Sequence, residues 1–276
     1  MLERSLRAET PRWTSPPNHS AGAELGAGGG LGAGGVVCVG FVGVAQAVAM
    51  LIVAMLIAAS ASATAAEPAP APPIRDHLLP YDAEREAQTL TYLERHRTGL
   101  LAGDPARRTR MTPRVIVLHW TAGATAASAR ATFAPATLAG RPDLADAGSL
   151  NVGAHYLVDR DGSIERLFPE DRIVRHCVGL NHVAIGIENV GGGSEWPLTE
   201  AQVDANAALV RWIASRQPIH TLIGHLEYRT LEGTEEFEER DPYYRTAKAD
   251  PGADFMRRVR DRISDLQLRG AAASTP

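Results

Sequence analysis

Three short, mainly apolar segments of this chain are each followed by an ionisable side chain, and this pattern constrains the fold most strongly. The segments are 114–118, 184–187 and 220–224, followed by His119, Glu188 and His225. Runs of this length, rich in β-branched and aliphatic residues, are typical of buried strands. Predicted helices separate them, which indicates an α/β fold: a single domain with a central mixed β-sheet flanked by helices.

Capping and turn residues predict the elements around these strands. Thr125 is a suitable N-cap, and Thr199 with Gln202 forms a capping box. An Asp-Gly pair at 161–162 favours a hairpin turn, and Pro251 is placed to open a last helix. The expected helices are 82–97, 125–133, 199–216 and 251–266; the strands are 114–119, 155–158, 163–167, 184–190 and 220–224; the loops are 135–149 and 226–247.

The N-terminal quarter has the order of an export signal. Three arginines are followed by an uncharged apolar stretch, 36–59, and then by small residues that form A-x-A cleavage patterns. The stretch is long enough to span a bilayer if it stays uncleaved. We therefore expect a signal peptide or signal anchor over 1–66, a linker and short helix over 67–106, the main domain over 107–268 and a disordered tail over 269–276. The protein is expected to be exported, periplasmic or secreted, with anchoring through this segment as the alternative.

Charge and cysteine content exclude some classes of protein. The formal charge of −4 shows no basic excess, so nucleic acid is not an expected partner. Of the two cysteines, Cys38 lies in the apolar leader, which leaves Cys177 alone in the exported domain. A domain with one cysteine has no internal disulfide, so its core must hold it together.

Two strand-end histidines favour a metal site. Neutral imidazole is a common zinc ligand, and a catalytic zinc needs three protein ligands and one open position. His119 and His225 are candidates, and Asp250 is the candidate for the third ligand. Each histidine has an alternative as a half-buried, hydrogen-bonded residue. For Asp250 the alternative is capping of the last helix, where a carboxylate is favoured in any case.

Glu188 and Lys248 are the candidate catalytic residues. Glu188 ends an apolar strand, where burial would raise its pKa and suit it to act as a general base; the alternative is a side chain that faces solvent. Lys248 is the only lysine among 28 Lys and Arg residues. A compact ammonium differs from a guanidinium fork, so a special role and chance survival of one lysine are both open. His155, His176 and Asn181 are expected to support the site or to contact substrate.

Five blocks of the sequence, in consistent order from about 107 to 262, resemble the zinc-dependent N-acetylmuramoyl-L-alanine amidases of the amidase-2 type. These are related to phage lysozyme-type amidases and to peptidoglycan recognition proteins. The blocks are VIVLHWTA at 115–122, NVGAHYLVDRDG at 151–162, RHCVGLNHVAIGIENVG at 175–191, LIGH at 222–225 and KADPG at 248–252.

The resemblance implies roles for the candidates. His119, His225 and Asp250 match the ligands of one Zn²⁺ ion, Glu188 matches the general base, and Lys248 matches a lysine that steadies the oxyanion. Phage members have a tyrosine where this chain has Ala154, which favours Glu188 as the base. The chain departs from compact members through its long insertion, 226–247.

The implied substrate is peptidoglycan or its muropeptides, cut between N-acetylmuramic acid and L-alanine. Three alternatives remain: a module that binds peptidoglycan without cutting it, a zinc peptidase that cuts within the stem peptide, and a domain whose zinc is only structural. All three ligand candidates together with Glu188 and Lys248 disfavour the first, and a glutamate beside an open metal position disfavours the third.

Overall fold

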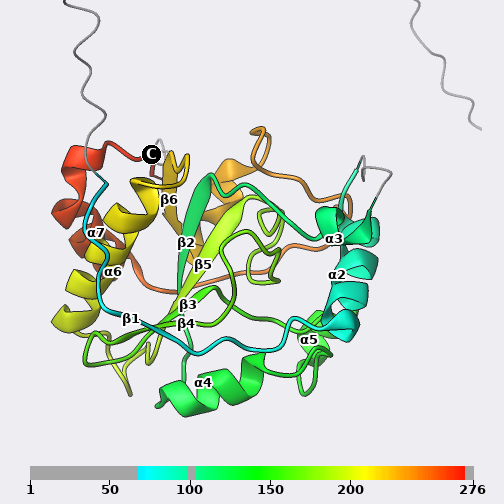
Figure 1. Cartoon of the computed structure of the whole chain (residues 1–276), viewed down its shortest axis with the longest axis horizontal. Helices are drawn as coiled ribbons and strands as arrows, with labels where there is room; N and C mark the ends of the chain where they lie inside the picture. The colour runs from blue at the N-terminus through cyan, green and yellow to red at the C-terminus, as the bar shows by residue number, and fades with distance from the viewer. Residues whose placement is uncertain (1–67, 99–103, 271–276) are drawn as a thin grey trace, which may run out of the picture. The chain divides into compact units, whose positions relative to one another are not determined.

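The computed structural model describes residues 68–98 and 104–270, which form a mixed β-sheet flanked by helices (Figure 1). The described strands are β1 Ile74–Asp76, β2 Val115–Trp120, β3 Tyr156–Val158, β4 Ile164–Arg166, β5 Ala184–Asn189 and β6 Thr221–Gly224. They lie in the order β1-β4-β3-β5-β2-β6, and only the β3–β4 pair is antiparallel. The predicted α/β class and mixed central sheet are confirmed.

The helices cover the sheet from different sides. The described helices are α2 Ala83–His96, α3 Pro105–Arg108, α4 Ala126–Phe133, α5 Pro142–Ala145, α6 Glu200–Ala214, η1 His225–Leu231, α7 Ala253–Arg262 and η2 Ser264–Leu266. Figure 1 shows α6 and α7 side by side on one side of the sheet and α2 on the other. None of the helices in the described ranges is both long enough and apolar enough to cross a bilayer.

Strand alternation decides which side chains reach the site. Successive residues of a strand face opposite sides of the sheet. Ile116 and Leu118 pack in the cluster that contains the apolar faces of α6 and α7. Val115 and Val117 pack in a second cluster, with the loop before β5. His119 continues this second set, so it faces away from α6 and α7.

Most predicted elements are found within one or two residues of their expected ends. The 155–167 hairpin forms as β3 and β4, Thr125 caps α4, and Thr199 and Gln202 form the capping box of α6. The last helix was expected to open at Pro251. That placement was wrong, because Gly252 is the N-cap at φ 88 and the helix begins at Ala253.

Several elements had no clear sequence signal. Strand β1 has three residues, two of them exposed, so it lacks an apolar pattern. Helix α5 lies in the expected loop 135–149. Helix η1 begins at His225, directly after the expected strand 220–224, and continues into the expected loop 226–247. Both are short, and their residues carry no helical periodicity.

The chain on both sides of the expected domain, 107–268, also contributes to the described structure. Strand β1 and α2 fall in the stretch assigned to a linker and short helix, yet β1 pairs with β4, and Tyr92 and Leu93 of α2 are buried. Arg269, expected in the tail, accepts a backbone hydrogen bond from Leu222 of β6. The leader, 1–66, and the tail beyond 270 lie outside the described residues, so those two assignments stay predictions.

Candidate active site

Three adjacent parallel strands bring the candidate residues to one edge of the sheet. His119 on β2 is in register with Glu188 on β5. On the other side of β2, Leu118 is in register with Gly224, the residue before His225. In open α/β sheets, ligands bind outside the carboxyl ends of the strands. The strand-end pattern in the sequence is therefore a spatial cluster in the structure.

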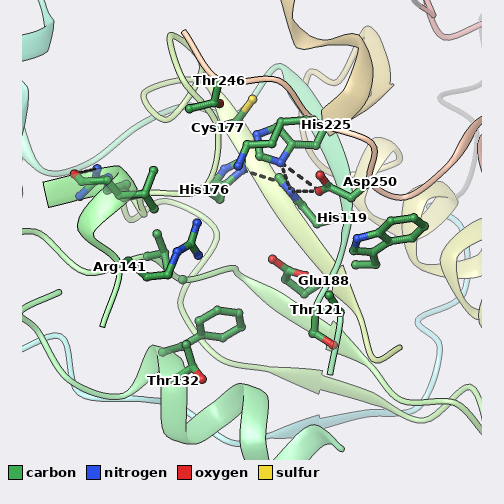
Figure 2. A pocket seen from close by; sticks show the side chains of 18 of the residues that line it. His119, Thr121, Thr132, Arg141, His176, Cys177, Glu188, His225, Thr246 and Asp250 are labelled. Atoms are coloured by element: carbon green, nitrogen blue, oxygen red, sulfur yellow. Dashed lines mark hydrogen bonds and ion pairs between the residues drawn. The ribbon is translucent and has the colours of Figure 1, made fainter. Parts of the chain in front are cut away.

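His119, His225 and Asp250 form a group that could hold a metal ion. The Nδ1 atoms of the two histidines are 2.9 Å apart, and Asp250 Oδ2 lies 3.1 Å from Nδ1 of His119 and 2.9 Å from Nδ1 of His225 (Figure 2). Ligand atoms around a tetrahedral zinc lie about 3.3 Å apart, given bonds near 2.0–2.1 Å. Two imidazole nitrogens and one carboxylate oxygen at this spacing fit a zinc site with an open position.

The protonation of these groups also suits a cation. Burial lowers the pKa of His225 to about 4, so its ring is neutral at pH 7. Burial by itself would raise the pKa of Asp250, but its interactions with the neighbouring imidazoles of His119 and His225 lower that pKa overall. Metal ligands must be neutral imidazoles and ionised carboxylates. Asp250 is therefore already in the ionised form that a metal ligand requires.

Glu188 has the properties expected of a general base. Burial raises its pKa to about 7, with His119 opposing the shift. Its Oε2 atom is buried and has no hydrogen-bond partner among the described residues. An ideal general base has a pKa close to the operating pH. The carboxylate is held at the site without a fixed partner that would compete for its lone pairs.

These residues open into one cavity of about 270 Å³. Figure 2 shows the His119, His225 and Asp250 cluster at one side of it, Glu188 just below the cluster, and Arg141 extending in from across the cavity. Lys248 also lines the cavity. All five candidate ligand and catalytic residues therefore face the same pocket.

The three predicted supporting residues lie deeper in the fold. His176 Nδ1 is 3.1 Å from His119 Nε2. Asn181 Oδ1 accepts the backbone N–H groups of His176 and Cys177. His155 is fully buried, and its ring contacts the backbone of Gly186 and Arg172. His176 and Asn181 also line the pocket, whereas His155 is not among the lining residues.

Sequence reasoning did not find several of the pocket residues. Arg141, Phe133, Arg175, Tyr244 and Thr246 line the cavity but lie in loops or at a helix end. Arg141 is exposed and holds Asp143 through two hydrogen bonds, of 2.9 and 2.8 Å. Nothing in local pattern separates these residues from ordinary loop positions, because only the folded chain brings them together.

The fold and pocket thus define an α/β domain with a candidate metal centre at the carboxyl edge of its sheet. The sequence model of the family Amidase_2, N-acetylmuramoyl-L-alanine amidase, matches residues 109–253. The chain belongs to this family.

Individual proteins are similar to parts of the chain. The endolysin of Escherichia phage T7 is 32% identical over 89 residues, which are 32% of this chain and 56% of the endolysin. The endolysin of Enterobacteria phage T3 is 32% identical over 84 residues, 30% and 53% of the two chains. The chain thus spans about half the length of these curated relatives. The solved N-acetylmuramoyl-L-alanine amidase LysC from Clostridium intestinale URNW is 21% identical, with a TM-score of 0.43 and coverage of 72% of this chain and 99% of that one.

Proposed function

We propose that this protein is a zinc-dependent amidase that hydrolyses the bond between N-acetylmuramic acid and L-alanine in peptidoglycan or its muropeptides. Family membership supports the amide bond and the substrate class. The observation that carries the proposal is the cluster of His119, His225 and Asp250 in one pocket with Glu188. A structural zinc site is closed by four protein ligands, whereas three ligands beside a free carboxylate suit catalysis.

The proposed mechanism assigns one task to each group. His119, His225 and Asp250 would hold zinc, which supplies Lewis acidity by polarising a carbonyl and lowering the pKa of a water. Glu188 takes a proton from the attacking water and later passes it to the amine of the leaving L-alanine. The ammonium of Lys248 stabilises the negative charge that develops on the carbonyl oxygen. The raised pKa of Glu188, about 7, suits both directions of proton transfer.

The test is to incubate the purified protein with peptidoglycan, with and without a chelator, and to identify new ends by mass spectrometry. Free L-alanine amino termini that disappear on chelation and return with zinc are the expected result. New ends within the stem peptide would show that the protein is a peptidase rather than an amidase. Binding to the polymer without new ends would instead indicate a recognition module, and the catalytic roles would fall with the enzyme.

The leader supports a related proposal about location. The order of arginines, apolar stretch and small residues over 1–66 favours export, so the polymer of the cell wall or its periplasmic fragments are the proposed substrates rather than cytosolic muropeptides. Cell fractionation with N-terminal sequencing of the mature protein tests this. A cytosolic protein that retains Met1 would overturn it.

A further inference from the structure

We propose that Tyr92 of α2, acting through Asn181 and His176, positions His119 to bind the metal, so that α2 is a working part of the metal centre. Helix α2 spans Ala83–His96 and lies before the stretch 109–253 that the family model matches. The inference rests on the proposed function only in taking the His119, His225 and Asp250 cluster as a zinc site.

The first step fixes the proton on His176. Its Nε2 atom is 3.0 Å from the carbonyl oxygen of Ala184. A carbonyl oxygen only accepts, so Nε2 carries the proton and donates. In a neutral ring the other nitrogen, Nδ1, then has a lone pair and accepts. The hydrogen bond to the backbone of β5 therefore sets the tautomer of His176, so that its Nδ1 atom can accept a hydrogen bond from His119.

In the second step, the tautomer of His176 sets the tautomer of His119. His119 Nε2 lies 3.1 Å from the accepting Nδ1 of His176, so it is Nε2 of His119 that donates. The lone pair of His119 is then on Nδ1, the atom that faces His225 and Asp250. A metal-binding histidine commonly donates its second ring N–H to a fixed acceptor, which sets its tautomer and orientation. His176 is that acceptor here.

The third step holds the His176 ring in place. A Cβ atom at Gly186 would come within 2.8 Å of the ring, so the ring packs directly on the bare backbone of β5. The backbone of His176 is also held, because Asn181 Oδ1 accepts the backbone N–H groups of His176 and Cys177, at 2.8 Å each. Two backbone donors on one side of the Asn181 amide require its oxygen there. Its Nδ2 group therefore points the other way.

The fourth step reaches α2. Asn181 Nδ2 donates to the hydroxyl oxygen of Tyr92, at 3.2 Å. Tyr92 is 4% exposed, its ring stacks on His96 at 4.3 Å, and the guanidinium of Arg175 lies 5.1 Å from its ring centre. The ring that carries this hydroxyl is thus held by its contacts with His96 and Arg175. A continuous chain of contacts joins Tyr92, Asn181, His176 and His119.

The experiment measures zinc affinity by competition with a chromophoric chelator, using the whole purified protein. His176→Leu removes the acceptor, and we expect zinc affinity to fall about 10- to 100-fold, the usual cost of losing such a partner. His176→Asn restores an oxygen near the position of Nδ1, so it should recover part of that loss. Tyr92→Phe removes one hydroxyl and should weaken zinc binding about threefold to tenfold.

A matched control separates this effect from general destabilisation. Tyr81 also packs against α2, and its hydroxyl bonds to Thr89 and to the carbonyl of Ile173 rather than to Asn181. Tyr81→Phe should therefore keep wild-type zinc affinity. Thermal unfolding of the metal-free variants shows whether each is folded. If His176→Leu does not fold, His176→Asn and Tyr92→Phe decide the question.

Each outcome decides between the inference and its alternatives. Wild-type zinc affinity in folded His176→Leu would overturn the role of His176, and wild-type affinity in Tyr92→Phe would overturn the role of α2. An equal loss of zinc affinity in Tyr81→Phe would show that the effects of the His176 and Tyr92 variants reflect general destabilisation of the fold. The assay needs no peptidoglycan, so zinc binding without hydrolysis would sink the proposed function alone. A wild-type protein that binds no zinc would sink both.

Discussion

Glu188 combines a cost in stability with its proposed role as general base. Its pKa is about 7 in the folded protein against 4.5 for an ordinary glutamate, because burial disfavours the charged form. The folded state therefore holds a proton that the unfolded chain has released. The stability contributed by that proton is fully present below pH 4.5 and is lost as the pH rises through 7.

Replacing Glu188 by glutamine should consequently raise stability and abolish activity. At pH 8, metal-free Glu188→Gln should unfold at a higher temperature than the wild type, with a gain of up to about 3 kcal/mol for a shift of this size. At pH 4.5 the gain should be close to zero. Amidase turnover should fall by about 10²- to 10⁴-fold, as expected for a lost general base. Thermal unfolding at the two pH values and the peptidoglycan assay check both statements, and an active variant would remove Glu188 from the mechanism.

Lys248 tests whether shape matters as well as charge. Lys248→Arg keeps the positive charge in the cavity but replaces a compact ammonium by a planar fork. Turnover should fall about 10²- to 10³-fold, the usual cost of a misplaced oxyanion donor, with an unchanged unfolding temperature. The reverse exchange at an exposed ion pair, Arg257→Lys on α7, is the control and should leave turnover unaltered. Near-normal turnover in Lys248→Arg would rule out the special role.

His155 makes part of the stability depend on acid pH. Burial lowers its pKa from 6.5 to about 4. Between these pH values the unfolded chain binds a proton at His155 and the folded protein does not. This contribution is present above pH 6.5 and is lost as the pH falls through 4, which amounts to about 3 kcal/mol. His155→Gln should show a flatter decline of the unfolding free energy between these pH values. The exposed His77→Gln should decline as the wild type does, and an equal slope in His155→Gln would exclude His155 as the source.

The site was predictable where its residues follow the strand pattern. His119, Glu188 and His225 end three apolar segments, and parallel pairing brings such ends together. Asp250 and Lys248 lie in a loop without periodicity, so the residues alone made them candidates but left helix capping and a chance lysine open, and the family resemblance was needed to favour the site roles. Tyr92 could not be found, because a buried tyrosine in a helix has the same sequence signal whether its hydroxyl supports a site or only fills the core.

At the level of elements, α2 is joined to α4 by one buried arginine. Arg85 is 2% exposed, and its Nη2 group donates to the carbonyls of Phe133, Ala134 and Pro135 at 2.7, 3.0 and 2.6 Å. Carbonyls at a helix C-terminus lack intrahelical partners, and a cation there also complements the helix dipole. Arg85 therefore completes the end of α4 from another element.

Arg85 does not itself line the pocket, and removing its guanidinium should destabilise the fold. Arg85→Met keeps much of the apolar stem but removes the donor from the buried carbonyl of Phe133 and the part-buried carbonyl of Ala134, which should lower the unfolding free energy by about 3 kcal/mol. Arg95→Met changes an exposed arginine of the same helix and should cost less than about 0.5 kcal/mol. Urea unfolding of the two variants makes the comparison. Equal stability would show that Arg85 contributes no more than a surface residue.

The elements were predictable where a pattern spans several turns or a buried strand. The capping box of α6, the Thr125 cap of α4 and the Asp-Gly hairpin are local signals, and the structure confirms each. Strand β1 and α5 were not predictable, because three or four residues carry too little periodicity. The buried side of α2 was also missed: Arg85, Thr89 and His96 are polar in sequence but buried by contacts with distant loops.

For the whole molecule, a metal ion at the proposed site would couple metal binding to global stability. The three candidate ligands come from the end of β2, the start of η1 and the segment before α7. An ion bound by all three would join parts of the chain that are far apart in sequence, and it would bind the folded state alone. Zinc at 100 times its dissociation constant should therefore add about 2.7 kcal/mol to the unfolding free energy, and a chelator should reverse the gain.

Variants can separate this linkage from catalysis. His225→Ala should lose both the zinc-dependent rise in unfolding temperature and hydrolysis, because two ligands hold zinc poorly. Glu188→Gln should keep the rise and lose hydrolysis, because Glu188 is not among the ligand candidates. Differential scanning calorimetry with and without zinc measures the rise. A rise that survives in His225→Ala would place the ion elsewhere, and a rise absent from Glu188→Gln would make Glu188 a ligand rather than a base.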